Sequence, residues 1–197
     1  FKGFLSGLGT MVDLRTHKGF AGKLDLKYFS NGKKMLYHVS DKVETAFHVA
    51  TLMPTASSDP QQVAKKRHLG NDHVTIVWNE HKRDYLPITV TSEFNDVVIV
   101  LSPLERKGLI RVKITSKEGI GSFGPLTDGI VVPFSRCAPL ARQTAINANR
   151  AVQETRDDWK GPTETRRSMI KDLVDQYGEP YRGGEVFESL SRVHRAA

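Results

Sequence analysis

The chain has almost no cysteine and no long apolar segment. Cys137 is the only cysteine in 197 residues, so an internal disulfide is impossible and a reducing, cytoplasmic location is expected. Its thiol lies in an S-R-C-A-P stretch just before an expected helix, which favours a structural role over a nucleophilic one. No apolar run approaches the roughly 18–20 residues that cross a bilayer, so we expect no direct insertion into a membrane.

Several nucleotide-binding and catalytic motifs are also missing. No G-x-x-x-x-G-K-[ST] loop exists, so the chain is not expected to hydrolyse a nucleotide by itself. The seven histidines have no H-E-x-x-H or C-x-x-C companions, and a zinc site is therefore not expected. A G-x-G-x-x-G pattern at 119–124 is followed by Pro125 and turn residues instead of a helix, so we interpret it as a coincidence of glycines.

The sequence does carry an excess of positive charge. Its 29 basic and 22 acidic residues give a net charge of +7, which indicates an acidic or phosphate-bearing partner. Nucleic acid, an anionic membrane and a protein–nucleotide complex all satisfy this charge. The first residues contain neither a starting Met nor a signal peptide, and we interpret the chain as a domain of a longer protein.

Periodicity and capping signals predict a mixture of strands and helices. Strands are expected over 33–37, His73–Asn79, Val97–Leu101, Leu109–Thr115 and Ile130–Val132. Helices are expected from a D-x-x-E capping box at 41–44, over 60–69, from Pro139 onward, and over Thr165–Tyr177 and Glu185–Val193. Residues 15–34 are rich in Gly and Lys and indicate a surface excursion or an irregular hairpin. This order predicts an α/β domain with a mixed central β-sheet flanked by helices.

The helix over 60–69 has the clearest start in the sequence. Asp59, Pro60 and Gln62 supply an N-cap acid, a proline at the first helical position and a glutamine three residues after the cap. We expect Gly70 to be its C-terminal cap. The apolar positions Val63, Ala64 and Leu69 form one narrow stripe, so the helix is expected on the surface.

A run of polar residues joins this helix to the next strand. The basic side chains, which the helix dipole favours at this end, are Lys65, Lys66, Arg67 and His68. Asn71 and Asp72 follow. These residues by themselves favour a left-handed cap at Gly70 and Asn71 over a functional carboxamide. A nucleic-acid patch is less favoured, because no aromatic residue lies among the basic ones to stack on bases.

Residues 47–54 (F-H-V-A-T-L-M-P) and 65–72 (K-K-R-H-L-G-N-D), followed by I-V-W, closely resemble the catalytic core of the Rap-GAP/tuberin family. The similarity continues through E-F-N-D-V-V-I-V at 93–100, F-G-P-L at 123–126 and A-R-Q-T-A-I-N-A-N at 141–149, and it includes F-L-S-G-L at 4–8. It therefore covers about residues 1 to 155. The segment 15–34 departs from the family because it is longer than expected.

The resemblance implies a domain organisation and a partner. Residues 1–158 would form a Rap-GAP-type catalytic domain, with a helical extension over 159–197 packing on it. Such domains stimulate GTP hydrolysis by small GTPases in their GTP state. The F-H-V-A-T-L-M-P-T stretch is similar to the tuberin branch, in particular to fungal members, which implies Rheb as partner and a role in TOR signalling. The N-E-H-K-R-D-Y and S-F-G-P-L-T-D-G stretches are similar to the catalytic α subunits of Ral GAPs, so Ral is the alternative and Rap a third.

The resemblance also implies a mechanism. Members of this family insert an asparagine thumb beside the GTP of the partner, and the matching residue here is Asn71. A carboxamide can accept a hydrogen bond from the attacking water and donate one to a phosphate oxygen. The residues expected to contact the partner or support the thumb are Lys65, Lys66, Arg67, His68, Asp72 and Arg142. No cofactor is expected, since GTP and Mg²⁺ would be bound by the partner.

Two other functions stay open at this stage. One is a Ral GAP, which differs from a Rheb activator only in its substrate. The other is a non-catalytic basic binding module that keeps the fold as a scaffold. Neither nucleic acid nor a membrane is the expected partner, and a larger chain and complex are expected around the domain.

Overall fold

The computed structural model describes residues 1–86, 94–105 and 108–178 of the chain. It divides into two compact units, Phe1–Arg156 and Asp157–Ala197. In the second unit the described part contains helix α4 (Pro162–Tyr177), which confirms the helix expected over Thr165–Tyr177. The helix expected over Glu185–Val193 lies outside the described residues. The packing of 159–197 on the domain stays a prediction.

The first unit contains a four-stranded sheet in the order β4-β5-β6-β7. Its strands are β4 (Val74–Trp78), β5 (Val97–Pro103), β6 (Leu109–Ser116) and β7 (Val131–Pro133). β4 and β5 are parallel, while the other neighbours are antiparallel, so the expected mixed sheet is confirmed. The continuous apolar run of β5 is buried along both faces from Val97 to Leu101, as in a central strand.

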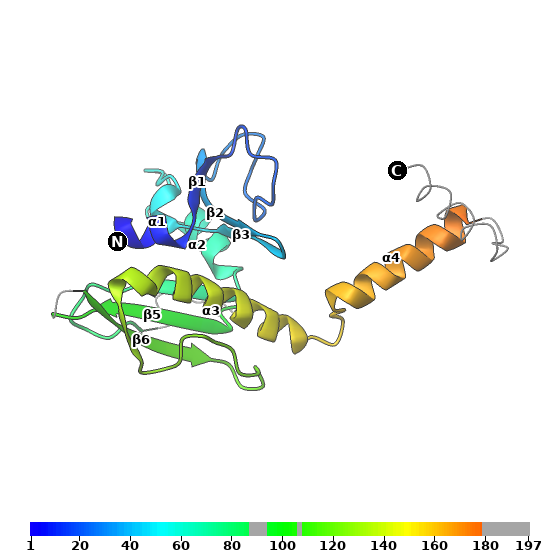
Figure 1. Ribbon diagram of the computed structural model, residues 1–197. Coiled ribbons are helices and arrows are strands. Elements are labelled where there is room, and N and C mark those ends of the chain that lie inside the picture. Colours follow the sequence, from blue (N-terminus) through cyan, green and yellow to red (C-terminus); the bar gives the residue numbers. More distant parts are fainter. Residues whose placement is uncertain (87–93, 106–107, 179–197) are drawn as a thin grey trace, which may run out of the picture. The chain divides into compact units, whose positions relative to one another are not determined.

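Helix α3 (Phe134–Glu154) packs on this sheet, and α1 (Lys2–Leu8) packs on α3 (Figure 1). Three small residues of α3 are buried where it packs against its neighbours, and they allow these elements to come close to it: Ala138, Ala141 and Ala148. The helix begins at Phe134, earlier than the expected start at Pro139. Pro139 lies in the second turn of α3, where it cannot donate to the Ser135 carbonyl, and the helix nonetheless continues through it. Neither α1 nor β1 was predicted from the sequence.

A second, antiparallel sheet has the order β1-β2-β3, with β1 (Thr10–Asp13), β2 (Lys34–Ser40) and β3 (Val43–Phe47). The helix predicted from the D-x-x-E box is wrong. Residues 41 and 42 form a turn, and the residues from Val43 to Phe47 form β3. Ser40 pairs with Val43, so the two residues between them make a tight hairpin turn. Glu44 accepts a hydrogen bond from the Phe20 backbone N–H at 2.6 Å, a contact distant in sequence that replaces the expected local cap.

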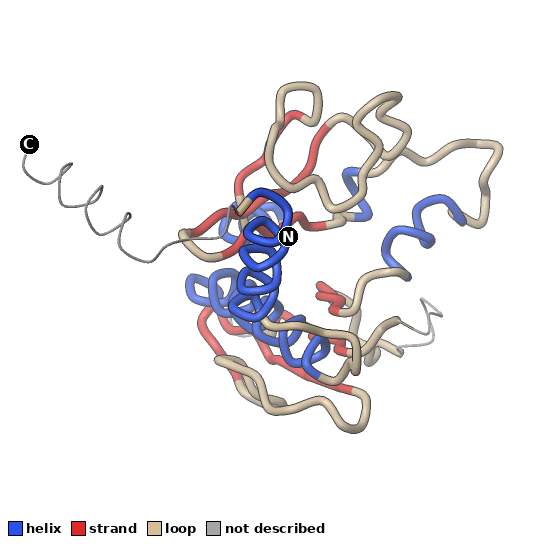
Figure 2. The backbone as a smooth tube through the Cα atoms, turned by 90° about the vertical axis from the view of Figure 1, so that its right-hand side faces the viewer, coloured by secondary structure: helices blue, strands red, loops and turns tan. Residues whose placement is uncertain are grey.

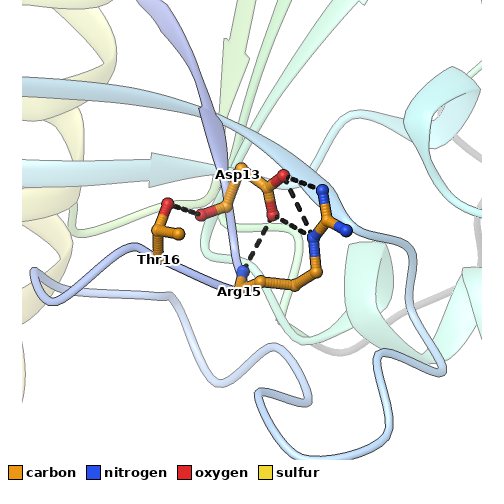
Figure 3. A network of polar contacts seen from close by, with 3 residues as sticks. All are labelled: Asp13, Arg15 and Thr16. Atoms are coloured by element: carbon orange, nitrogen blue, oxygen red, sulfur yellow. Dashed lines mark hydrogen bonds and ion pairs between the residues drawn. The ribbon is translucent and has the colours of Figure 1, made fainter.

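The β1–β2 connection, residues 14–33, is the surface excursion that the sequence predicts. At its base, Asp13 binds the Arg15 side chain and backbone N–H (Figure 3). Leu14 and Leu24 of the connection form a small apolar cluster with Met35 of β2 and with Met53. The connection is therefore packed against the small sheet and not a free loop.

Among the described residues, none of the helices combines the length and apolarity that a membrane crossing needs.

Candidate functional site

Helix α2 (Val63–Gly70) carries the basic residues singled out in the sequence. It begins three residues later than expected, because Gln62 adopts a left-handed backbone conformation that a helix does not continue through. Asp59 still caps it: its carboxylate accepts hydrogen bonds from the Val63 and Ala64 backbone N–H groups, at 2.9 and 3.0 Å. In Figure 2 a loop leads into α2 from the small sheet, and another leads out to the larger sheet.

The predicted left-handed cap at the other end of α2 is wrong. Gly70 is the last helical residue and is buried, and Asn71 follows with φ −92° and ψ −2° in the right-handed region. The Asn71 backbone N–H donates to the His68 carbonyl at 3.2 Å. Its side chain is exposed and makes no hydrogen bond within the described part of the chain. The carboxamide is thus not used as a cap and points its donors and acceptor at solvent.

The residue after it, Asp72, is held by a histidine of the small-sheet side. The His48 Nδ1 lies 2.8 Å from the Asp72 Oδ2, and the His48 Nε2 lies 2.8 Å from the Gly22 carbonyl oxygen. Burial lowers the pKa of His48, but the Asp72 carboxylate and the Gly22 carbonyl outweigh it and raise the pKa overall. Since both ring nitrogens face acceptors, the protonated imidazolium is the form that donates at both positions.

His68, on the last turn of α2, is held by a different partner. The Asn31 Nδ2 donates to the His68 Nε2 at 2.8 Å, which requires a neutral imidazole with an unprotonated Nε2. Burial and the neighbouring charge of His48 lower the pKa of His68. The two rings meet edge to face at 5.7 Å between centroids. One histidine of the pair is thus suited to carry a proton and the other to remain neutral.

On the other side of Asn71, His73 is tied to the larger sheet. Its Nδ1 lies 2.6 Å from the Asp96 Oδ2, and the Lys117 ammonium lies 2.7 Å from the Asp96 Oδ1. Burial raises the pKa of Asp96, yet the bonds from Lys117 and His73 lower it overall. The two residues that follow Asn71 are therefore each fastened by a histidine–carboxylate pair, and with Asn71 they form the Asn71 loop, residues 71–73.

The basic residues of α2 face outward. Lys66 and Arg67 are exposed, whereas Lys65 is half-buried and donates to the Thr55 hydroxyl at 2.6 Å. The predicted apolar stripe is wrong in its first half, since Val63 is 58% exposed and Ala64 is exposed too. Among these positions only Leu69 is half-buried, beside the buried Gly70, and hydrogen bonds hold much of the rest of the helix.

Arg142 is not part of this cluster. Its guanidinium donates to the carbonyls of Gly7 and Leu8, at 2.8 and 2.9 Å, and so ties the end of α1 to α3. Those carbonyls are among the last of α1 and have no partner within the helix. In the structure Arg142 supports the packing of two helices.

An open groove of about 1600 Å³ passes beside the Asn71 loop in the first unit. Four of the residues singled out from the sequence line it: Arg67, His68, Asn71 and Asp72. Apolar side chains of α1 and β4 form another part of its lining, including Phe4, Ile76 and Trp78. The Asn71 carboxamide therefore lies at a hollow surface with both basic and apolar groups.

Metal and thiol chemistry find no support in the described residues. No group of three or more His, Cys, Asp or Glu side chains suited to a metal ion occurs among them. Cys137 is buried in α3, and burial raises its pKa to about 11, so the thiolate is scarce at neutral pH.

Comparison with known proteins places this fold in a family. The family model described as Rap/ran-GAP matches residues 1–170. The chain is 39% identical to Ral GTPase-activating protein subunit alpha-1 of Homo sapiens over 180 residues, which are 91% of this chain and 9% of that protein. It is 42% identical to subunit alpha-2 of Mus musculus over 179 residues, again 91% and 9%.

The solved structure of the TSC2 GAP domain matches with a TM-score of 0.70 at 30% identity, covering 78% of this chain and 83% of that one. The mixed α/β architecture is thus that of a GTPase-activating domain. The chain belongs to the Rap/ran-GAP family. It spans about a tenth of the length of the curated relatives it matches.

The sequence analysis did not find His48 or Asn31 as site residues. His48 lies in the F-H-V-A-T-L-M-P stretch that carries the resemblance, which is a signal that could have drawn attention to it. Nothing in the sequence around Asn31 indicates its bond to His68, 37 residues away.

Proposed function

We propose that this domain stimulates GTP hydrolysis by a small GTPase by inserting Asn71 beside the nucleotide of its partner. The observation that supports it is the exposed Asn71 carboxamide, which no hydrogen bond occupies in the described chain, between His68 on one side and Asp72 and His73 on the other, all three held by side-chain hydrogen bonds. Such a group can accept from the attacking water through its oxygen and donate to a phosphate oxygen through its nitrogen. Orientation of this kind lowers the activation barrier by reducing the entropy lost on reaching it.

The partner would supply GTP and Mg²⁺, and this chain would supply a catalytic residue in trans. Lys66 and Arg67, exposed beside Asn71, would attract the acidic surface of a GTPase–nucleotide complex. Asp72 and His68 would position the loop. Arg142 would act only through the packing of α1 on α3.

Two GTPases are candidate substrates, each with its own support. The 39% and 42% identity to Ral GAP alpha subunits favours Ral. The F-H-V-A-T-L-M-P-T stretch and the similarity to the TSC2 GAP domain favour Rheb, and with it a role in TOR signalling. Release of phosphate from GTP-loaded Ral, Rheb and Rap, measured with the same domain preparation, decides which GTPase it activates.

The mechanism is tested by replacing Asn71. Asn71→Ala should retain association with the GTP-loaded partner and lose at least about 100-fold of the stimulated rate. Asn71→Asp should lose as much, because a carboxylate repels the phosphate and cannot donate. Phosphate release at saturating domain gives the rate, and titration of the partner gives Kd.

Gln61→Ala is the matched control, since it removes an exposed carboxamide that precedes the same helix. It should behave as the unsubstituted domain. If Asn71→Ala lost affinity for the partner to the same extent as stimulated rate, Asn71 would be a binding residue and its proposed role as asparagine thumb would be wrong. A domain that binds a GTPase without stimulating it at all would instead be a non-catalytic binding module.

A further inference from the structure

The site contains a support that the proposed mechanism does not use. Helix α2 has only eight residues, and the first of them, Val63 and Ala64, are exposed and supply little apolar contact. Near its C-terminal end, two hydrogen-bonded links run to one distant segment, the β1–β2 connection (residues 14–33).

We propose that the β1–β2 connection positions the Asn71 loop, through Asn31 on His68 and through Gly22 and His48 on Asp72. His48, Asn31 and Gly22 are then positioning residues, which act on hydrolysis through the loop and touch neither nucleotide nor water. The inference rests on the proposed function for its kinetic consequence, but the links themselves do not depend on it.

The first link fixes the last turn of α2. The Asn31 amide is oriented by its own oxygen, which accepts the Asp25 backbone N–H at 3.0 Å, so its nitrogen is left to donate to His68 at 2.8 Å. Asp25 in turn accepts the backbone N–H groups of Lys27 and Tyr28, at 2.9 and 3.0 Å. Asn31 therefore extends from an internally bonded turn and not from a free loop.

The second link fixes Asp72 itself. The Gly22 carbonyl accepts from the His48 Nε2, and the His48 Nδ1 is directed at the Asp72 carboxylate. Gly22 has φ +60°, and a Cβ there would lie 2.9 Å from the Ala46 Cβ and 3.1 Å from the His48 Nε2. Only glycine brings its carbonyl this close to the ring without displacing its neighbours.

The two links end on either side of Asn71, at His68 and at Asp72. Loss of either would leave the helix folded, because Asp59 caps its start and Leu69 and Gly70 anchor its end. The loss of either link would let the Asn71 carboxamide move relative to the attacking water and the phosphate of the partner's GTP. Displacement of about 1 Å at a reacting centre costs up to about 100-fold in rate, while binding of the partner by Lys66 and Arg67 would be preserved.

The test compares Asn31→Ala and His48→Gln with two controls from the same segment. Thr16→Ala removes a hydroxyl bond to the Asp13 carbonyl, and His17→Gln removes a ring that lies against Tyr37. Neither residue lines the groove beside the Asn71 loop. Asn31→Ala and His48→Gln should each lower the stimulated rate at saturation about tenfold with Kd unchanged within about twofold. The controls should change neither.

A second readout needs no GTPase. Hydrogen exchange of the free domain should be at least about fivefold faster at residues 68–73 in Asn31→Ala and His48→Gln, and unchanged there in the controls. Since Asn31 is near the surface, its variant should fold even if His48→Gln does not.

The two failures can be told apart. If Asn71→Ala is inactive while Asn31→Ala and His48→Gln match their controls in rate and exchange, the positioning inference is wrong and the thumb stands. If Asn71→Ala is fully active, the proposed function is wrong, and faster exchange at 68–73 still establishes the links. Unchanged exchange in both variants overturns the inference regardless of activity.

Discussion

At the scale of single residues, the site depends on two neighbouring histidines that prefer opposite protonation states. His48 is partly disfavoured as a charged ring by its burial, but it faces a carboxylate and a carbonyl, which favour the charged form. His68 faces the Asn31 amide donor, which only a neutral ring nitrogen can accept. At a pH above the lowered pKa of His68 and below the raised pKa of His48, His68 is neutral and His48 is charged. In that range His68 accepts from Asn31 while His48 donates to Asp72 and to the Gly22 carbonyl.

This arrangement predicts a pH dependence of stability. Because the pKa of folded His48 is raised above 6.5, its pairing with Asp72 is fully present below pH 6.5 and is lost as pH rises through the folded value. The free energy of unfolding should therefore fall across that window, by at most about 1.4 kcal/mol per pH unit for one proton. Urea unfolding from pH 6 to 8.5 measures it, and His48→Gln should give a flatter profile. Identical profiles would contradict the assignment.

The exposed cations of α2 predict a salt-dependent encounter with the partner. Lys66→Glu and Arg67→Glu should each slow association with the GTP-loaded GTPase by roughly three- to tenfold at low salt, because the field that steers an acidic partner is reversed locally. Stopped-flow association at several salt concentrations measures this. Lys42→Glu, in the β2–β3 turn, is the charge-matched control. Association that does not respond to salt in the unsubstituted domain would place docking elsewhere.

At the scale of elements, the sheet and α2 are stabilised differently. β5 is buried along its length, while α2 presents an exposed first turn and is fastened near its ends by Asp59 and the His68 and Asp72 links. An element that is packed on both faces is rigid but has no surface left for a partner. A helix held by a few polar bonds keeps its outer face exposed, and a partner can bind there.

Substitutions should separate the two kinds of element. Leu101→Ala, at a residue with no exposed surface, should lower the free energy of unfolding by about 2–5 kcal/mol through lost burial and a residual cavity. Val63→Ala, at a residue 58% exposed on α2, should change it by less than about 0.5 kcal/mol. Urea unfolding of both variants tests the contrast. A large cost for Val63→Ala would mean that α2 packs through its first turn.

At the scale of the whole molecule, the buried residues of the described chain all lie between Phe4 and Val152. The helix of the second unit has no buried residue, and its Met169, Ile170 and Leu173 are 57–61% exposed. Among the described residues, the buried core of the first unit is formed by residues of Phe1–Arg156.

A chain that ends at Arg156 should therefore fold and unfold in one cooperative transition. Circular dichroism with thermal unfolding, beside the full chain, measures this. A shortened chain without a cooperative transition would contradict the expectation. A Tm several degrees below that of the full chain would support the packing of residues 159–197 on the domain that the sequence analysis predicts, since removal of a packed segment costs apolar burial.

Elements with a strong local periodicity could be predicted from the amino-acid sequence alone. The alternation in β6, the continuous apolar run of β5 and the polar junction at Asn71 were all readable, because neighbouring residues decide them. The D-x-x-E box at 41–44 wrongly predicted a helix, because it too is only a local pattern. Its local capping pattern was overridden by pairing with β2 and by a bond from Glu44 to Phe20, 24 residues away.

The contacts around Asn71 could be found only in the folded chain. The bond of His48 to Asp72 spans 24 residues, that of Asn31 to His68 spans 37, and that of Arg142 to Gly7 spans 135. Such contacts leave no periodic trace, because the chain between their ends is free to vary while the fold alone brings them together. The sequence located the carboxamide, and the fold supplied the links that hold it in place.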